Sequence, residues 1–160
     1  MSRSRNLVLG AALTLLAPGS VLGQAAATPP PAPAFDAELA RKVGADARGM
    51  RNYVLVILKT GPTRVPAGAE RDEMFKGHFA NMERLAKAGK LAIAGPFGSN
   101  DGGWRGLYIF AVTDVEEARS LVATDPVVAK GEMVPEFHAW YGSAALMVVP
   151  ETHDRLVKKN

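Results

Sequence analysis

The sequence predicts an α+β domain of the ferredoxin-like type, with strands and helices in the order β, α, β, β, α, β. Two observations support this prediction. Four apolar runs rich in β-branched and aromatic residues alternate with two runs whose apolar residues recur at helical spacing. Right-handed crossovers then place both helices on one face of a four-stranded antiparallel sheet. The expected strands are 51–59, 91–97, 104–112 and 134–141, and the expected helices are 69–88 and 115–122.

The first strand, 51–59, is apolar on both of its faces. A sheet with one face in water would alternate apolar and polar residues, so both faces of this strand must be covered. The helices cover one face, and we expect a second copy of the chain to cover the other, which gives a homodimer through the open sheet face. The two alternating sets are Tyr53, Leu55 and Ile57 on one side and Val54, Val56 and Leu58 on the other.

The first helix, 69–88, is amphipathic and ends at Gly89, a residue suited to the left-handed position after a last helical turn. His78 lies three residues after Phe75 and four before Met82, which places it at the edge of the apolar stripe. His78 is therefore the best candidate for chemistry. The stripe expected to face inward consists of Phe75, Phe79, Met82, Leu85 and Ala86.

The second helix, 115–122, follows Asp114, which with Glu117 has the spacing of a capping box. Thr124-Asp125-Pro126 ends this region, because the residue before proline disfavours helix, and Pro126 then favours a new short helix. Pro135 near the start of the last strand favours an edge position.

Residues 1–23 have the layout of a secretory signal peptide. Arg3 and Arg5 precede an apolar run over 7–17, which Pro18-Gly19 closes. The run is shorter than the roughly 20 residues that a membrane-spanning helix needs. The alternative is an uncleaved anchor. We expect cleavage, a periplasmic or secreted protein, and no stable membrane insertion afterwards.

Residues 24–50 are expected to form a proline- and alanine-rich linker with a short accessory helix over 36–43, capped by Asp36 and ended by Gly44. The ferredoxin-like domain is expected over 51–143. The weakly patterned residues 144–160 are expected to form a C-terminal tail.

The composition excludes or disfavours several classes of function. The chain has 160 residues, 48% hydrophobic and 22% charged, which suits one globular core. The formal net charge of +3 falls to +1 without Arg3 and Arg5, so nucleic-acid binding is not expected. The sequence has no cysteine, which excludes disulfides and thiol nucleophiles. Asp72, Glu73 and His78 lack metal-ligand spacing, so we expect no metal and no cofactor.

The topology also brings His78 near Asp125, because both helices lie on the same face. A carboxylate bound to an imidazole fixes its tautomer and makes it a general base. For His78 the alternative is a half-buried histidine bonded to a backbone carbonyl, and for Asp125 it is a helix N-cap. Capping and orienting can coexist, because a carboxylate has two oxygens.

Three sets of residues match a known family: Gly77-His78, the run 87–91 followed by Ala94-Gly95-Pro96-Phe97, and Thr124-Asp125-Pro126-Val127 followed by Gly131. With these motifs, the chain resembles the YciI-like (YCII-related) proteins of the dimeric α+β barrel superfamily over about 53–143. The resemblance implies a ferredoxin-like dimer with an active site formed by His78 and Asp125. A chlorohydroquinone dehydrochlorinase is similar to these proteins, and muconolactone isomerases share the fold.

The leading hypothesis is an exported, cofactor-independent lyase or isomerase in which His78 moves a proton on a small cyclic or aromatic substrate and Asp125 orients it. Phe97, Gly95 and Trp140 are assigned to substrate binding. The alternative is a noncatalytic ligand-binding or structural dimer. Aromatic residues that could line a pocket, or else belong to the core or dimer contact, are Phe97, Trp104, Tyr108, Phe110 and Trp140.

Overall fold

A computed structural model describes residues 34–158. The expected signal peptide and most of the proline-rich linker lie outside these residues. The described strands are β1 (Met50–Thr60), β2 (Leu91–Pro96), β3 (Trp104–Phe110) and β4 (Met133–Ser143). The helices are α1 (Ala37–Val43), α2 (Ala69–Lys87), α3 (Val115–Val122), α4 (Pro126–Ala129), the 3₁₀ helix η1 (Ala144–Val148) and α5 (Val149–Asp154).

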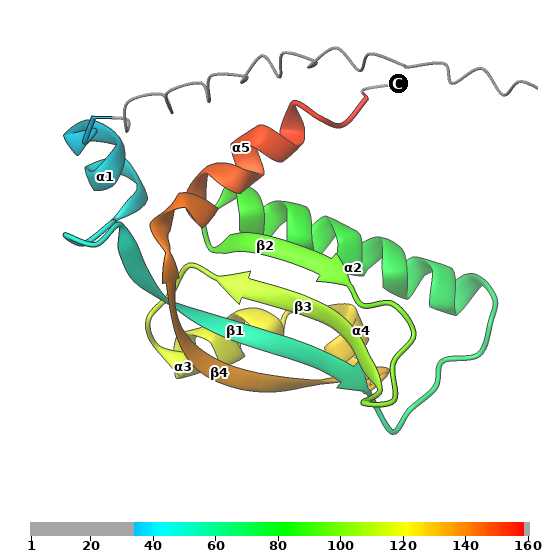
Figure 1. Cartoon of the computed structure of the whole chain (residues 1–160). Coiled ribbons are helices and arrows are strands. Elements are labelled where there is room, and N and C mark those ends of the chain that lie inside the picture. Colours follow the sequence, from blue (N-terminus) through cyan, green and yellow to red (C-terminus); the bar gives the residue numbers. More distant parts are fainter. Residues whose placement is uncertain (1–33, 159–160) are drawn as a thin grey trace, which may run out of the picture. The chain divides into compact units, whose positions relative to one another are not determined.

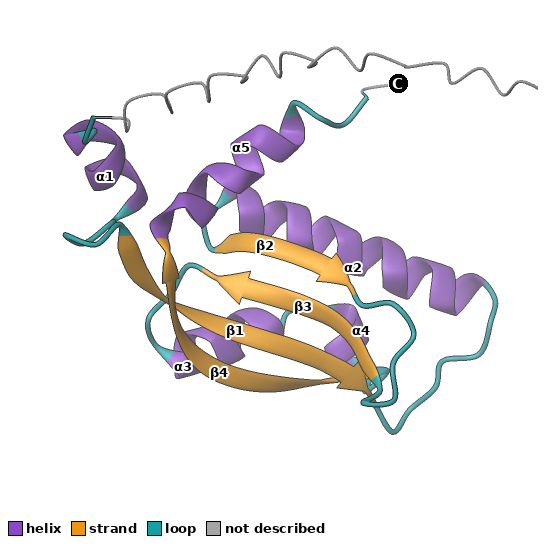
Figure 2. Ribbon diagram, in the orientation of Figure 1, coloured by secondary structure: helices purple, strands orange, loops and turns teal. Residues whose placement is uncertain are grey.

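The four strands form one antiparallel sheet in the order β2-β3-β1-β4 (Figures 1 and 2). β1 is central and pairs with β3 and β4, so that Val56 lies opposite Tyr108 on one side and Phe137 on the other. β4 is an edge strand, as Pro135 indicated. The order β, α, β, β, α, β and this strand arrangement confirm the predicted ferredoxin-like fold.

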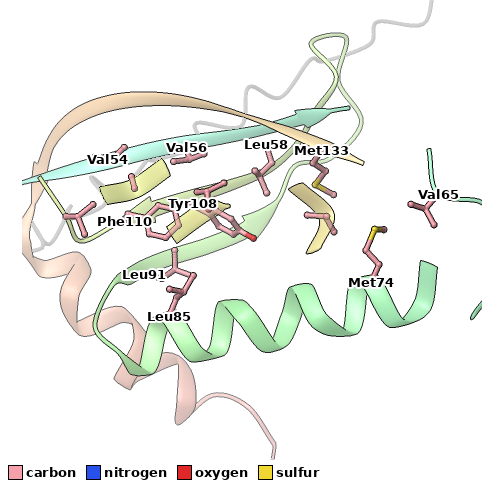
Figure 3. Close-up of a cluster of buried hydrophobic side chains, with 14 residues drawn as sticks. Val54, Val56, Leu58, Val65, Met74, Leu85, Leu91, Tyr108, Phe110 and Met133 are labelled. Atoms are coloured by element: carbon pink, nitrogen blue, oxygen red, sulfur yellow. The ribbon is translucent and has the colours of Figure 1, made fainter. Parts of the chain in front are cut away.

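The main core lies between the sheet and the helices. Val54, Val56 and Leu58 of β1 are almost fully buried there, together with Leu85 of α2 and Val122 of α3. In Figure 1, α3 and α4 lie behind the strands, so the sheet is seen from its opposite face. Figure 3 shows the cluster running from Phe110 and Leu91 to Met74 and Val65 along α2.

The C-terminal segment covers part of the opposite face. The sequence predicted a weakly patterned tail here, and in the structure η1 and α5 follow β4 directly and turn back over the sheet near β2. The face available to a second subunit is therefore smaller than expected. In this second cluster, Leu146 and Met147 pack against Tyr53, Ala92 and Ile109.

The buried face of α2 is rotated from the predicted stripe. Phe79, expected to face inward, is 60% exposed, whereas His78 is buried in the middle of the face rather than at its edge. Asn81 is buried although it is polar, because its side-chain oxygen accepts hydrogen bonds from Arg84 and Thr124. A hydrophobic pattern alone could not identify polar residues that are satisfied by partners distant in sequence.

The helix ends follow the sequence with one exception. Gly89 has φ of 67°, the left-handed conformation expected after α2. Asp114 caps α3 by accepting from the backbone N–H of Glu116. The reciprocal half of the predicted capping box does not form, because Glu117 instead binds Lys90 Nζ at 2.8 Å. Within residues 34–158, every helix is too short or too polar to cross a bilayer.

Candidate active site

His78 and Asp125 are 47 residues apart in sequence and in direct contact in the structure. Nδ1 of His78 lies 2.9 Å from Oδ1 and 2.8 Å from Oδ2 of Asp125. A carboxylate offers only acceptors, so Nδ1 carries the proton and Nε2 keeps its lone pair in the neutral ring. Within residues 34–158, no hydrogen bond occupies Nε2, and the side chain is 10% exposed. The imidazole is therefore oriented with its basic nitrogen free.

Asp125 also begins α4. Its Oδ1 accepts the backbone N–H of Val127 at 3.1 Å, and its extended backbone is that of an N-cap residue. Pro126 at the first helical position fixes the turn that follows. The side chain is fully buried, so α4 holds the carboxylate away from water and in one orientation. Capping and contact with His78 thus occur in the same residue.

Tyr108 is the third member of the site. Its hydroxyl donates to Oδ2 of Asp125 at 2.7 Å and lies 3.3 Å from Nδ1 of His78. Figure 3 shows the hydroxyl oxygen directed away from Phe110, toward α4. Burial, the charge of Asp125 and the hydrogen bond to it all raise the pKa of Tyr108, so it stays protonated and donates. The sequence indicated Tyr108 only as an aromatic residue that lines a pocket or belongs to the core or dimer contact. Strand alternation could have placed it on the face toward α2.

Gly77 allows α2 to approach α4 closely. A Cβ at this position would lie 3.0 Å from Cγ of Pro126, so the residue beside His78 must be small for the two helices to keep this distance. Hydrogen bonds also join α2 to Thr124, which lies just before α4. The hydroxyl of Thr124 donates to Oδ1 of Asn81 at 3.1 Å, and Arg84 donates to both of these residues.

Two phenylalanines flank the imidazole. The ring of Phe75 meets the His78 ring edge-on with centroids 5.9 Å apart, and the ring of Phe79 lies 5.4 Å away. Phe75 is half-buried, whereas Phe79 is mostly exposed. Aromatic surface therefore borders the imidazole that carries the free nitrogen. A planar ligand could contact this surface.

Of the three residues predicted to bind substrate, the structure places Trp140 on the face of the sheet opposite to His78. Gly95 lies opposite Leu107 in the sheet, one position beyond the pair of Ala94 and Tyr108. Phe97 packs its ring against Trp104, with centroids 5.2 Å apart. Trp140 packs on Tyr53 at 5.6 Å, on the open face of the sheet. The structure thus separates Trp140 from His78 by the thickness of the sheet.

A groove of about 610 Å³ lies away from this site, between α2, β2 and α5. It is lined by apolar residues such as Met82, Leu91 and Val149 and includes none of His78, Asp125 and Tyr108. Within residues 34–158, no group of three or more His, Asp or Glu side chains is placed to hold a metal ion.

The sequence model of the YCII-related domain matches residues 52–136, just over half of the chain. The chain belongs to the YCII-related domain family. This confirms the predicted family, and the matched region runs from β1 to β4 and includes His78, Tyr108 and Asp125.

The YCII-related chain is also similar to a solved structure, 5-chloro-2-hydroxyhydroquinone dehydrochlorinase from Burkholderia phenoliruptrix in complex with 2,5-dihydroxybenzoquinone. The identity is 23% and the TM-score 0.39, covering 54% of this chain and 92% of that chain. No curated protein sequence matches the chain.

Proposed function

We propose that this YCII-related protein is an enzyme that moves a proton on a small cyclic or aromatic substrate. His78 is the base, and Asp125 orients it. One observation supports the proposal most: a buried carboxylate holds Nδ1 of His78 at 2.8 Å while Nε2 has no partner in the described part of the chain. A proton taken up at Nε2 creates an imidazolium that the adjacent negative charge stabilises.

Two reaction types suit one base without a nucleophile. In an elimination, Nε2 of His78 takes a proton from a carbon next to a carbonyl group. The electrons of that C–H bond form a C=C bond, and a leaving group departs from the adjacent carbon with its bonding pair. In an isomerisation, the imidazolium returns the same proton to a different carbon. Both schemes use proton transfer at His78 alone, so we propose that the reaction needs no cofactor.

The aromatic residues around His78 favour a flat substrate. Phe79 exposes most of its ring beside the imidazole, and Phe75 presents its edge on the same helix. A ring that stacks on Phe79 would bury apolar surface and bring a ring carbon close to Nε2. The aromatic surroundings of His78 therefore support a cyclic or aromatic substrate.

Proton exchange tests the proposal without a known substrate. In D₂O, the protein is incubated with small cyclic ketones and lactones, and ¹H NMR follows deuterium entry at the carbon next to the carbonyl group. We expect exchange with the wild type and a loss of at least about a hundredfold in His78→Ala, the usual range of a general base. Binding of these compounds without exchange would instead support a noncatalytic ligand-binding module.

Asp125→Asn tests the role of the carboxylate. Asparagine caps helices as well as aspartate does, so α4 should remain. The imidazolium formed at Nε2 of His78 loses its negative neighbour, so deuterium exchange is expected to be slower than with the wild type. Unchanged exchange would contradict the proposed dyad.

We propose that two copies associate through the open sheet face. Leu55, Ile57 and Leu107 are half-buried there, and Trp140 is 36% exposed, which leaves apolar surface that a second copy would cover. Light scattering after size exclusion tests this. We expect a dimer for the wild type and a monomer for Ile57→Arg. A monomeric wild type at micromolar concentration would contradict the dimer.

We also propose that the protein is exported, with residues 1–23 removed as a signal peptide. The proposal rests on the arginines and the apolar run of the N-terminal sequence. Mass spectrometry of the protein recovered from a bacterial periplasm would test it. Recovery of the uncleaved chain from the cytoplasm alone would contradict export.

A further inference from the structure

A second buried carboxylate, that of Glu132, lies near the start of α2, where it pairs with Arg71. Glu132, directly before β4, is fully buried although it is charged. The loop that connects β1 and α2 wraps around it: Val65 N–H donates to Oε2 at 2.8 Å, and Gly61 N–H donates to the backbone carbonyl of Glu132 at 2.9 Å. The loop and the start of β4 thus hold this side chain in place.

Three arginines surround Glu132. Nη1 of Arg71 lies 2.9 Å from Oε1, Nη1 of Arg64 lies 3.2 Å away, and Nη1 of Arg105 lies 3.7 Å away. Within residues 34–158, none of the three forms an ion pair with another acidic residue. The cluster therefore has a formal charge of +2, although one guanidinium would neutralise the carboxylate.

The arginines surround Oε1 without directing an N–H at it. Arg71 is within hydrogen-bond distance, but its Nη1 donates to the carbonyl of Val65 at 2.8 Å, and Oε1 has no aligned donor among the described residues. Each guanidinium has five N–H groups, and among the described residues the bond from Arg71 to Val65 is the one hydrogen bond that these three groups donate, which leaves most of their N–H groups available to a ligand. Arg71 and Arg105 are themselves largely buried, with side chains 20% and 27% exposed, which strengthens their attraction for an anion.

The cluster lies in line with His78. Arg71 precedes His78 by two turns of α2, about 10 Å, and Arg105 precedes Tyr108 by three residues of β3, again about 10 Å. Arg71 and Arg105 meet at Glu132, and His78 and Tyr108 meet at Asp125. α2 and β3 therefore run side by side in the same direction, with the arginines at one end and the imidazole at the other.

An aromatic side chain connects the two ends. The guanidinium of Arg71 lies 4.9 Å from the centroid of the Phe75 ring, and the same ring meets His78 edge-on at 5.9 Å. A molecule with a flat apolar body and a charged end would match this sequence of groups.

We propose that Arg71 and Arg105, with Arg64 at the rim, bind a carboxylate of the substrate, and that the substrate is therefore a cyclic or aromatic acid. This inference rests on the proposed role of His78 and narrows its substrate class. The acid group and the reacting carbon would be separated by roughly a ring and a short side chain. Glu132 holds the guanidinium groups in position and limits how tightly the anion binds.

The test compares two probes of the same shape and different charge, 3-phenylpropionate and 3-phenylpropionamide, by NMR titration of the full chain. We expect the acid to shift the Arg71 and Arg105 side-chain resonances in a salt-dependent way, and the amide to leave them unchanged. Arg105→Gln should weaken binding of the acid about tenfold, because a charge-assisted bidentate contact is lost. Equal binding of the two probes would overturn the proposal.

Three further variants sharpen the result. Glu132→Gln raises the cluster charge and should tighten binding of the acid, whereas a purely structural Glu132 would leave the affinity unchanged or lower it. Arg155→Gln removes one positive charge at an exposed position and should have no effect. Affinity for the acid should persist in His78→Ala. If the acid binds there but proton exchange never occurs with the wild type, the acid site stands and the proposed catalysis fails.

Discussion

Gly77 and Pro126 fix how closely α2 and α4 approach, since a Cβ on Gly77 would lie 3.0 Å from Cγ of Pro126. This contact flanks both members of the dyad, because His78 follows Gly77 and Asp125 precedes Pro126. The distance between the imidazole and the carboxylate is therefore set by the packing of two backbones, which makes it sensitive to one methyl group.

Gly77→Ala is expected to lengthen the contact between His78 and Asp125. Alanine gains about 1 kcal/mol of helix propensity, but overpacking against Pro126 costs about 1–3 kcal/mol, so stability should fall by about 1 kcal/mol. Chemical denaturation measures this change, and the Nδ1–H resonance of His78 should move upfield. Gly98→Ala, at a position with open space around it, serves as the control. A more stable variant with an unchanged resonance would contradict the prediction.

Tyr108→Phe is expected to lower the free energy of unfolding by about 1–2 kcal/mol, because Oδ2 of the buried Asp125 loses a donor. The loss should shrink at high pH. The pKa of Tyr108 is raised in the folded state, so its contribution is complete below about pH 10 and disappears as the pH rises toward the folded value. Denaturation at pH 8 and pH 10.5 tests this. An equal difference between variant and wild type at both pH values would argue against it.

Glu132→Gln is expected to make the free energy of unfolding less dependent on pH below neutrality. Burial raises the pKa of Glu132, but the hydrogen bond from the Val65 N–H and the positive charges of Arg71 and Arg64 outweigh burial and lower it. The carboxylate thus stabilises the fold above about pH 4.5, and this contribution is lost as the pH falls.

At pH 7 the loss in Glu132→Gln should be about 1–3 kcal/mol, and at pH 3 it should be smaller. Urea denaturation at the two pH values gives both numbers. Glu151→Gln, which removes an exposed carboxylate, controls for the change in net charge. The same acid dependence in wild type and Glu132→Gln would show that Glu132 is not responsible.

Leu146→Ala is expected to destabilise the fold by about 1–2 kcal/mol, less than a fully buried leucine would, because Leu146 is half-buried on Tyr53 and Ile109. Leu156→Ala is the same substitution at a side chain that is 76% exposed and should change little. Thermal unfolding of both variants provides the comparison. Similar melting temperatures would mean that η1 contributes little to the sheet it covers.

The sequence was sufficient for the fold because its signals are local. The two-faced apolar pattern of β1, Gly89 after α2 and Pro126 at the start of α4 each specify their own element, and the connection rules then allow few topologies. The rotation of α2 and the packing of η1 depended on contacts distant in sequence. The position of Asn81 in the buried face follows from Thr124, 43 residues away.

The contact of His78 with Asp125 was predicted from topology and the family motifs. Tyr108 and the cluster around Glu132 were not, because their importance lies in partners that only the tertiary structure brings together. A lone tyrosine in an aromatic strand and three arginines scattered over 64–105 carry no spacing that would indicate a shared role.

Because Asp125 both starts a helix and holds the imidazole, selection for a stable protein and, under the proposed function, selection for proton transfer would act on one position. Alanine at position 125 would fail both requirements, because it neither caps the helix nor binds the imidazole. Asparagine distinguishes them: it would satisfy the demands of folding while surrendering the negative charge. In a homologue that has lost the activity but keeps the fold, asparagine at this position would be tolerated. An Asp-to-Asn replacement here is therefore the change that we expect to accompany loss of activity.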